Sequence, residues 1–199
     1  MGKLEQNKQQ KEHSLFQAAF DLFTNKGFTK TTISDIVKQA KLAKGTFYLY
    51  FKDKYDLRDQ LIARKAGQIF LEAYEHLEEH PVSGFENQMM QIIDYIIEYL
   101  QKNHLLLQFI TKNLSWGILK NAFERTAPEE TMEFYAHYLD LMKSSSVSCR
   151  EPELMLFTIV ELVGATCYSC ILYKQPVSME EYLPCLHRSI HAIIRAYTL

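Results

Sequence analysis

The stretch that decides the expected fold is Lys44-Gly45-Thr46-Phe47-Tyr48-Leu49-Tyr50-Phe51-Lys52-Asp53-Lys54. Phe47 and Phe51 lie four residues apart, so on a helix they share one face and can anchor it to a hydrophobic core. The lysine, threonine and tyrosine side chains of this stretch are donors that reach phosphate groups and base edges of nucleic acid. One apolar face and one basic, aromatic face predict a short helix that lies against DNA.

The residues before this stretch predict a second short helix, over residues 32–40. Thr32 is a good N-cap, and Asp35 occupies the N3 position of a capping box. The apolar stripe of this helix consists of Ile33, Ile36, Val37 and Ala40. Residues 41–43 then form a break. A helix, a short turn and a second helix make up the helix-turn-helix, whose second helix enters the major groove of DNA.

A third helix is predicted upstream, where apolar residues recur at helical spacing between residues 15 and 23. Gly27 suits the left-handed position that ends such a helix. Phe28 can pack beneath the two helices that follow. The three helices would together form a compact domain with its own core.

The segment from Phe16 to Leu57 resembles the DNA-binding domain of the TetR family of bacterial transcriptional regulators. The matching residues are Ala19, Leu22, Phe23, Gly27, Phe28, Thr31, Thr32, Ile33, Ile36, Ala40, Lys44, Gly45, Thr46, Phe47, Tyr48, Tyr50, Phe51, Lys54 and Leu57. The resemblance implies an all-α protein, with a three-helix helix-turn-helix DNA-binding domain at residues 1–54 and a helical effector-binding and dimerisation domain at residues 55–199. It also implies a homodimeric repressor that binds a near-palindromic operator and is released by a small apolar or amphipathic effector.

The predicted DNA contacts are Thr32, Lys41, Lys44, Gly45, Thr46, Tyr48, Tyr50, Lys52 and Lys54. Thr46 and Tyr48 are expected nearest the bases, Gly45 would let the backbone approach closely, and the other side chains are expected on the phosphate backbone. Two positions depart from the family. Lys41 replaces the usual glycine of the turn, and a non-glycine residue at positive φ costs about 1 kcal/mol. Ala43 replaces the usual Ser or Thr, which removes a helix cap that contributes about 1 kcal/mol.

The charge distribution indicates a basic binding module attached to an acidic body. The net charge of the 199-residue chain is −2, which alone argues against nucleic acid as a partner. Residues 1–66, however, hold 13 Lys or Arg against 7 Asp or Glu, whereas residues 67–199 hold 9 against 17. The alternative explanation is a solvated basic face with no role in DNA binding.

Turn and capping residues divide the rest of the chain into helices, which brings the expected total to about nine. The expected boundaries are a long helix that begins at Asp53 and ends at His80-Pro81, a capping box of Ser83 and Glu86, a break at Trp116-Gly117, helix starts at Pro128 and Pro152, and a cap of Ser178 and Glu181 on the last helix.

Residues 154–172 form a mostly apolar run that could be considered as a membrane span. Glu161 near its middle argues against this interpretation, because a carboxylate at mid-bilayer depth is costly. A helix buried within the protein or in a dimer is expected instead. By resemblance, residues 152–198 are expected to pair with their copies in a four-helix homodimer interface. The alternative is that both helices are intramolecular core.

Aromatic side chains are frequent in the body, and most are expected to pack in the core. Tyr and Trp also carry polar groups, so burying many of them favours a cavity with a few oriented hydrogen bonds. The family resemblance implies an effector pocket there. His137, four residues after Glu133, is expected to pair with it at the surface instead. The expected wall residues of the pocket are Tyr95, Tyr99, Phe109, Trp116 and Tyr138.

Other chemistry has weaker support in the sequence. One group of residues has the order of zinc-finger ligands: Cys167 and Cys170, followed by His187 and His191. The two cysteines lie in an apolar helix, however, where buried structural thiols explain them better. No catalytic set, cofactor or metal site is predicted, and free thiols fit a reducing cytoplasm. The alternatives to a ligand-responsive repressor are an activator, a regulator controlled by a protein partner and, with least support, an all-α enzyme.

Overall fold

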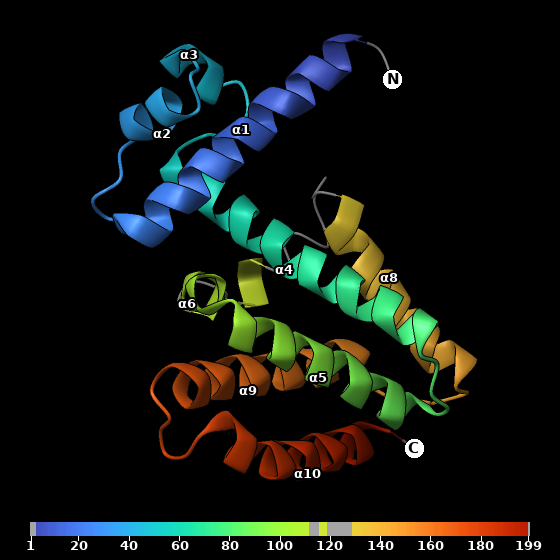
Figure 1. The fold of residues 1–199 in the computed structure, drawn as a ribbon. Helices are drawn as coiled ribbons and strands as arrows, with labels where there is room; N and C mark the ends of the chain where they lie inside the picture. The colour runs from blue at the N-terminus through green and yellow to red at the C-terminus, as the bar shows by residue number, and fades with distance from the viewer. Residues whose placement is uncertain (1–2, 112–115, 119–128, 199) are drawn as a thin grey trace. The chain divides into compact units, whose positions relative to one another are not determined.

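The structure is a computed structural model that describes residues 3–111, 116–118 and 129–198 (Figure 1). These residues are mainly helical and contain no strand; one isolated β-bridge pairs Cys149 with Thr198. The predicted all-α class is therefore confirmed. The chain divides into two compact units, residues 1–62 and residues 63–199. The boundary proposed after residue 54 falls at the start of α4 (Lys54–Glu79), whose first residues belong to the N-terminal unit.

The N-terminal unit consists of α1 (Lys3–Asn25), α2 (Ile33–Gln39), α3 (Lys44–Phe47) and the first residues of α4. Phe16 of α1 meets Phe51 edge-on, with ring centres 5.1 Å apart. This contact joins α1 to the segment after α3, as the spacing of Phe47 and Phe51 predicts. The fully or nearly buried apolar side chains of the unit are Leu15, Phe16, Ala18, Ala19, Phe23, Ile36, Val37, Phe47, Phe51, Leu57, Leu61 and Ile62.

Local interactions fix how the chain passes from α1 to α2. Gly27 has a φ of 89°, the left-handed conformation predicted for it. The hydroxyl of the buried Thr31 donates to the Gly27 carbonyl at 2.8 Å. Thr32 Oγ1 accepts from the Asp35 N–H at 3.1 Å, and the Asp35 carboxylate accepts from the Thr32 N–H at 2.9 Å. The predicted capping box is therefore present.

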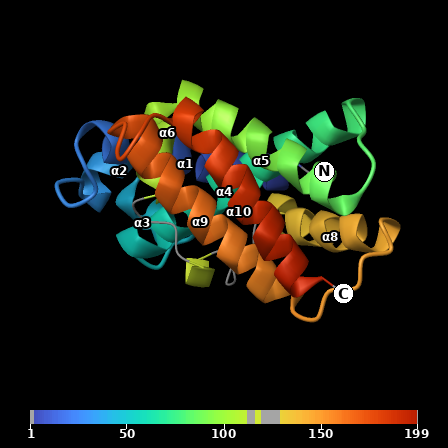
Figure 2. The same ribbon diagram turned by 90° about the horizontal axis from the view of Figure 1, so that it is seen from below.

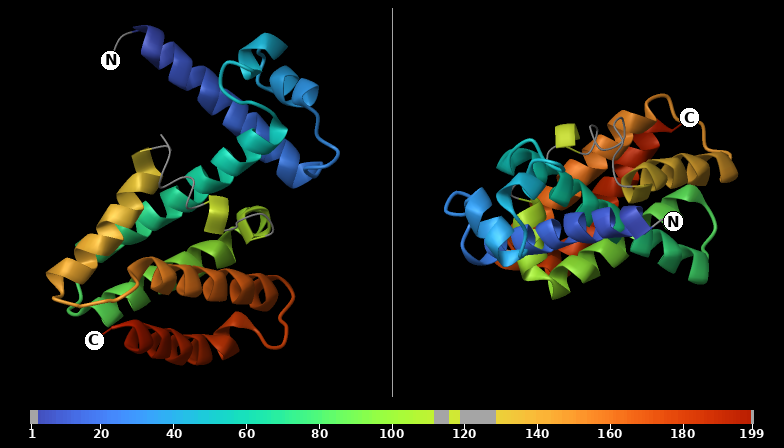
Figure 3. Two further views of the ribbon diagram at one scale, coloured as in Figure 1. Left: turned by 180° about the vertical axis from the view of Figure 1, so that it is seen from behind. Right: turned by 90° about the horizontal axis from the view of Figure 1, so that it is seen from above.

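The C-terminal unit contains the rest of α4 together with α5 (Phe85–Lys102), α6 (His104–Thr111), a helical segment at residues 116–118, α8 (Glu129–Ser144), α9 (Pro152–Leu172) and α10 (Met179–Tyr197). α9 and α10 run antiparallel and side by side (Figures 2 and 3). α5 packs against α6, α8, α9 and α10, which makes it the central helix of this unit.

α9 is long and apolar enough to cross a membrane by length and composition, with a mean hydropathy of 1.8 over its most apolar window. The core helix of a globular protein passes the same test, and 39% of this window is buried inside the chain. α9 packs against α5, α6 and α10, as expected of a core helix. Its exposed positions include Leu154, Phe157, Glu161 and Ala165.

Two predicted helix boundaries are wrong. α5 begins after Gly84, which takes the N-cap position at a φ of 86° and offers no capping side chain. The Glu86 carboxylate, expected in a capping box with Ser83, instead meets His191 Nδ1 of α10 at 2.9 Å. Trp116 and Gly117 lie within a helical segment rather than at a break.

The other boundaries agree with the expectation where the structure describes them. α4 ends at Glu79, directly before His80-Pro81, and α9 begins at Pro152. Ser178 caps α10, since its side chain accepts from the Glu181 N–H at 3.3 Å. Pro128, expected at a helix start, lies outside the described residues.

Candidate DNA-binding surface and effector cavity

The turn between α2 and α3 shows how the chain tolerates a lysine in place of glycine. Lys41 has a φ of 56°, the left-handed conformation expected at this position. Its N–H donates to the Lys38 carbonyl at 3.2 Å, and the Leu42 N–H donates to the Val37 carbonyl at 2.9 Å. This pair of bonds is a Schellman motif, which ends α2 and satisfies its last carbonyls. The Lys41 side chain is exposed, so its ammonium group is free to reach a phosphate.

α3 is a single turn whose two faces differ as predicted. Phe47 and Phe51 are 0% and 1% exposed, and they hold the segment against the core. Ala43 precedes α3 without a capping hydrogen bond from its side chain. After Phe47 the chain continues in turns, with the Tyr50 N–H donating to the Phe47 carbonyl at 3.0 Å. The residues from 44 to 50 therefore form a short, rigid ridge.

The opposite face of this ridge carries the predicted base-contacting residues. Tyr48 is 54% exposed, and its ring meets the Phe47 ring edge-on at 5.4 Å, which orients it away from the core. Thr46 and Tyr50 are half-buried, while Lys44, Gly45 and Lys52 are exposed. Leu49, which the sequence did not single out, is 79% exposed. An exposed leucine between two tyrosines suits contact with thymine methyl groups, so Leu49 joins the candidate surface.

Two of the predicted phosphate contacts already have partners within the protein. Lys54 Nζ donates to the carbonyls of Phe28 and Thr31 at 2.9 and 2.8 Å, and lies 4.3 Å from the centre of the Phe28 ring. An ammonium group has three donors, so one remains. The Thr32 hydroxyl donates to the Asp35 carboxylate at 2.9 Å. The structure thus gives both residues a role in positioning the segment before α2.

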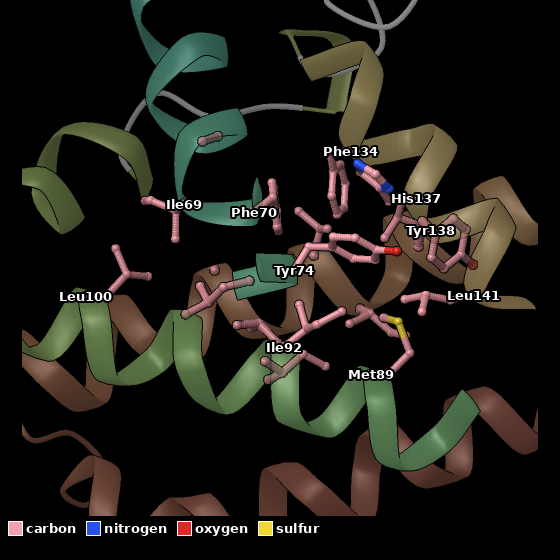
Figure 4. A pocket seen from close by; sticks show the side chains of 18 of the residues that line it. Ile69, Phe70, Tyr74, Met89, Ile92, Leu100, Phe134, His137, Tyr138 and Leu141 are labelled. Carbon is pink, nitrogen blue, oxygen red and sulfur yellow. The ribbon is translucent and has the colours of Figure 1, made fainter. Parts of the chain in front are cut away.

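An apolar cavity lies in the C-terminal unit, with walls from α4, α5, α6, α8 and α9. Figure 4 shows Phe70 facing Phe134, whose rings stack with centres 3.9 Å apart. The free space open to the centres of water molecules is about 90 Å³. The lining residues are Ala66, Ile69, Phe70, Tyr74, Met89, Ile92, Ile93, Ile96, Leu100, Ile110, Phe134, His137, Tyr138, Leu141, Leu156, Ile159, Val160, Val163 and Gly164.

The few polar groups of the cavity wall gather on α4 and α8. Tyr74 stacks on the His137 ring, with centres 4.0 Å apart, and Tyr138 Oη donates to the Pro152 carbonyl at 2.9 Å (Figure 4). Burial raises the pKa of both tyrosine hydroxyls, so they stay protonated and act as hydrogen-bond donors. His137 lines this cavity, while the side chain of Glu133, its expected partner, lies outside the described residues.

The structure brings one of the five predicted pocket residues, Tyr138, into the cavity wall. Tyr95 and Tyr99 line a separate, more polar groove together with His76 and residues of α5. Phe109 is buried but does not line the cavity. Trp116 meets the Phe157 ring of α9 edge-on at 5.4 Å and is also absent from the cavity wall. Sequence periodicity could not separate these roles, because it does not show which helices face one another.

The cysteines behave as structural thiols. Cys167 and Cys170 are 0% and 2% exposed within α9, and burial raises the pKa of Cys167 to about 12. Cys170 Sγ contacts the Gln175 carbonyl, whereas His187 and His191 point to Asp94 and Glu86 at 2.7 and 2.9 Å. Cys170, His187 and His191 therefore each contact a different partner, and Cys167 is buried within α9.

A helix-turn-helix with an exposed basic and aromatic ridge, carried by a helical body with an apolar cavity, defines a DNA-binding transcriptional regulator. Residues 15–61 match the family of bacterial regulatory proteins known as the tetR family. This match covers the helix-turn-helix, so residues 15–61 are similar to the DNA-binding domain of tetR-family regulators.

Similar proteins extend the likeness beyond the DNA-binding domain. The uncharacterized HTH-type transcriptional regulator YhgD of Bacillus subtilis strain 168 is 24% identical over 168 residues, which cover 83% of this chain and 87% of that protein. A TetR-family transcriptional regulator of Syntrophomonas wolfei has the same fold at 21% identity and a TM-score of 0.66, covering 94% of this chain and 95% of that one. The regulator FadR of Bacillus subtilis, solved with stearoyl-CoA, matches at 19% identity and a TM-score of 0.59, covering 89% and 96%.

Proposed function

We propose that the protein is a transcriptional repressor that binds a near-palindromic operator as a homodimer and releases it when a small apolar or amphipathic effector occupies the cavity. The observation that carries the proposal is the position of α4. One end of this helix belongs to the DNA-binding unit, where Lys54 holds the segment before α2. Further along, Ala66, Ile69 and Tyr74 form part of the cavity wall.

The size of the cavity favours coupling between the two sites. Its free space of about 90 Å³ is small, and pockets that hold small molecules typically measure roughly 300–1,000 Å³. An effector therefore has to displace wall helices in order to fit, and α4 is one of these. A ligand shifts a conformational equilibrium by its difference in affinity for the two states. The state with an expanded cavity would then be the state with weaker operator binding.

The wall residues favour an effector with an apolar body and one polar group. Nearly all of the lining is aliphatic or aromatic, and the polar atoms belong to Tyr74, His137 and Tyr138. The stearoyl-CoA bound by FadR of Bacillus subtilis has a long apolar chain of this kind. Long-chain acyl compounds are accordingly the first effectors to test. The protein would act in the cytoplasm, where its operator lies.

The homodimer is proposed to form through residues 152–198, as in the family. α9 carries exposed apolar side chains at Leu154 and Phe157, which are 47% and 36% exposed in the single chain. On α10, the exposed positions Ala192 and Ala196 are small and would allow close approach of a second copy. Pairing these two helices with their copies would give a four-helix interface.

Release of DNA by stearate or stearoyl-CoA tests this proposal in a fluorescence-anisotropy titration of labelled operator. Gly164 lines the cavity, and a Cβ atom added there meets no atom within 4 Å. Gly164→Leu should fill this space and weaken the effector while leaving operator affinity intact. Ala136→Leu adds the same side chain at an exposed position of α8 and serves as the matched control.

The outcomes separate the candidate mechanisms. Saturating operator should weaken effector binding by the same factor by which the effector weakens operator binding, roughly 5–150-fold. If Gly164→Leu responds to the effector as the unaltered protein does, the effector binds elsewhere. If no small molecule releases DNA, control by a protein partner becomes the leading explanation, and rising transcription on operator binding would indicate an activator.

A further inference from the structure

The last turn of α4 and the residue directly after it bring together three side chains that can bind a metal ion. His76, Glu79 and His80 each offer one ligand atom, and these atoms all lie within 4.8 Å of one another. Their spacing along the sequence places them on the same face of a helix. Within residues 3–111, 116–118 and 129–198, this is the one group of three or more His, Cys, Asp or Glu side chains whose ligand atoms come this close together.

The hydrogen bond of His80 determines which of its ring nitrogens is available. His80 Nδ1 lies 3.3 Å from the His76 carbonyl oxygen. A carbonyl oxygen only accepts, so Nδ1 carries the proton and donates to it. Nε2 of the neutral ring then presents its lone pair to a metal ion. Histidine ligands of metal ions usually have this arrangement, in which the second ring nitrogen donates to a carbonyl or carboxylate and fixes the ring.

The surroundings of the cluster favour a cation and hold its backbone in place. The cluster lies at the C-terminal end of a long helix, where the helix dipole is negative. Gln91 Nε2 donates to the His80 carbonyl at 2.9 Å, which ties this residue to α5. The His76 ring packs against His80 and Tyr95, with centres 4.6 and 5.1 Å away, and lines the groove that also contains Glu98.

We propose that His76, Glu79 and His80 form a binding site for a divalent transition-metal cation of the Zn²⁺ class. Two imidazoles and a carboxylate are a donor set that Zn²⁺ accepts, leaving a fourth position for water or an outside ligand. Zinc bonds of about 2.0–2.2 Å bring tetrahedral ligand atoms to roughly 3.4 Å from one another. Glu79 and His80 are exposed, so rotation of their side chains can close the remaining distance.

This site is separate from the effector cavity and rests on none of its residues. Tyr74 of the cavity wall lies only two residues before His76 on the same helix. A cation bound by His76, Glu79 and His80 would hold the last turn of α4 to the residue after it. It would therefore suppress fraying of that turn and of the connection to Pro81. Metal binding should therefore stabilise the chain against unfolding whether or not an effector is present.

Isothermal titration of the tag-free full chain with ZnCl₂, paired with thermal unfolding followed by circular dichroism, tests this inference. One Zn²⁺ should bind per chain and raise the unfolding temperature. Glu79→Gln and His80→Ala, at exposed positions, should each lower zinc affinity by at least the roughly 10–100-fold that loss of an outer-shell partner costs. His104→Ala removes an exposed histidine at the start of α6, and Cys185→Ser an exposed thiol. Both controls should bind zinc as the unaltered chain does.

Nuclear magnetic resonance of the histidine rings gives a readout that folding defects do not imitate. Zinc should shift the Nε2 resonance of His80 and the ring signals of His76, leaving those of His187 and His191 unchanged. The inference is overturned if the unaltered chain binds no zinc, if Glu79→Gln and His80→Ala both bind it with unaltered affinity, or if Cys185→Ser abolishes binding.

Discussion

Gly45 is surrounded by enough open space to accept a side chain. A methyl group built there meets nothing within 4 Å, and the residue does not have a positive φ. Neither backbone conformation nor packing within the chain therefore requires glycine. Close approach of the backbone to DNA, as predicted for this residue from the sequence, would give glycine a reason at this position.

Gly45→Ala should consequently separate DNA binding from stability. Alanine should keep or raise the free energy of unfolding, by up to about 1 kcal/mol, because it restricts the unfolded chain. Operator affinity should fall by roughly tenfold or more, equivalent to about 1.4 kcal/mol. Anisotropy titration and chemical denaturation measure the two quantities. Unaltered operator affinity would place Gly45 away from DNA.

Lys44 and Lys54 should respond differently to the same truncation. Lys44 is exposed, so Lys44→Ala should weaken binding to all DNA sequences and reduce the slope of log affinity against log salt by about 0.9. Lys54→Ala would remove the donor to two carbonyls, those of Phe28 and Thr31, and should lower the free energy of unfolding by about 1–3 kcal/mol. Equal stability of the Lys54→Ala and unaltered proteins would contradict the positioning role.

Predictions from the sequence succeeded at the residue scale where the pattern is local. The buried pair Phe47 and Phe51 follows from spacing, and the left-handed Gly27 follows from turn chemistry. The left-handed Lys41 was expected from the glycine that the resembled family usually has there. Lys54 shows the limit of this reasoning. Its partners lie 23 and 26 residues earlier in the chain, and no local pattern reveals that such a lysine bends back to backbone carbonyls.

At the scale of a single element, α2 depends on one carboxylate. The Lys26 ammonium, 2.7 Å away, holds the pKa of Asp35 well below its usual value, and the N–H and hydroxyl of Thr32 add to the effect. A depressed carboxyl pKa contributes stability above the unfolded-state value, near 4. That contribution is lost as pH falls toward the folded-state pKa.

Asp35→Asn should therefore lower the unfolding temperature at pH 7, and the difference from the unaltered protein should shrink as the pH falls below about 4. Thermal unfolding at pH 7 and at pH 3 measures both differences. Asp140→Asn is the matched control, since Asp140 pairs with the exposed Lys143 on the helix surface, and such pairs contribute little. A difference between Asp35→Asn and the unaltered protein that grows on acidification would contradict this account of α2.

Helix boundaries also show what a sequence pattern can miss. Ser83 and Glu86 have capping-box spacing, yet Glu86 is used in a tertiary contact with His191, 105 residues away along the chain. Gly84, not Ser83, then takes the N-cap position of α5, with a φ of 86° and no capping side chain. The Ser178 cap was predicted correctly because no distant partner competes for that hydroxyl among its described contacts.

At the scale of the whole molecule, the position of the cavity could not be predicted. Its walls come from five helices, and residues with similar sequence character fall inside it or away from it. Tyr138 lines the cavity, whereas Tyr95 lies in the groove beside His76. The difference depends on which helix faces which neighbour, a property of packing rather than of local periodicity. The existence of a cavity was predicted mainly from the family resemblance, with the many aromatic side chains of the body as support.

The proposed dimer surface gives a prediction at the same scale. Ala165 and Ala192 are exposed in the single chain, on α9 and α10 respectively. A charge at either position should leave the chain folded but prevent two copies from pairing, because an arginine buried there would lack a partner. Ala165→Arg and Ala192→Arg should yield monomers by sedimentation, with helical content unchanged. Ala136→Arg, on the exposed face of α8, should remain dimeric. If both interface variants remain dimeric, the dimer does not form through residues 152–198.

The most direct test of the regulator is selection of bound DNA from a random double-stranded pool with the full chain. The account predicts enrichment of an inverted repeat whose half-sites lie a whole number of helical turns apart, at about 34–36 Å per turn. Thr46→Ala and Tyr48→Ala should each lose enrichment at specific bases while retaining salt-dependent binding to unrelated DNA. Enrichment of no sequence by the unaltered protein, or the same enriched sequence from both variants, would contradict the assignment of residues 44–50 as the surface that reads the operator.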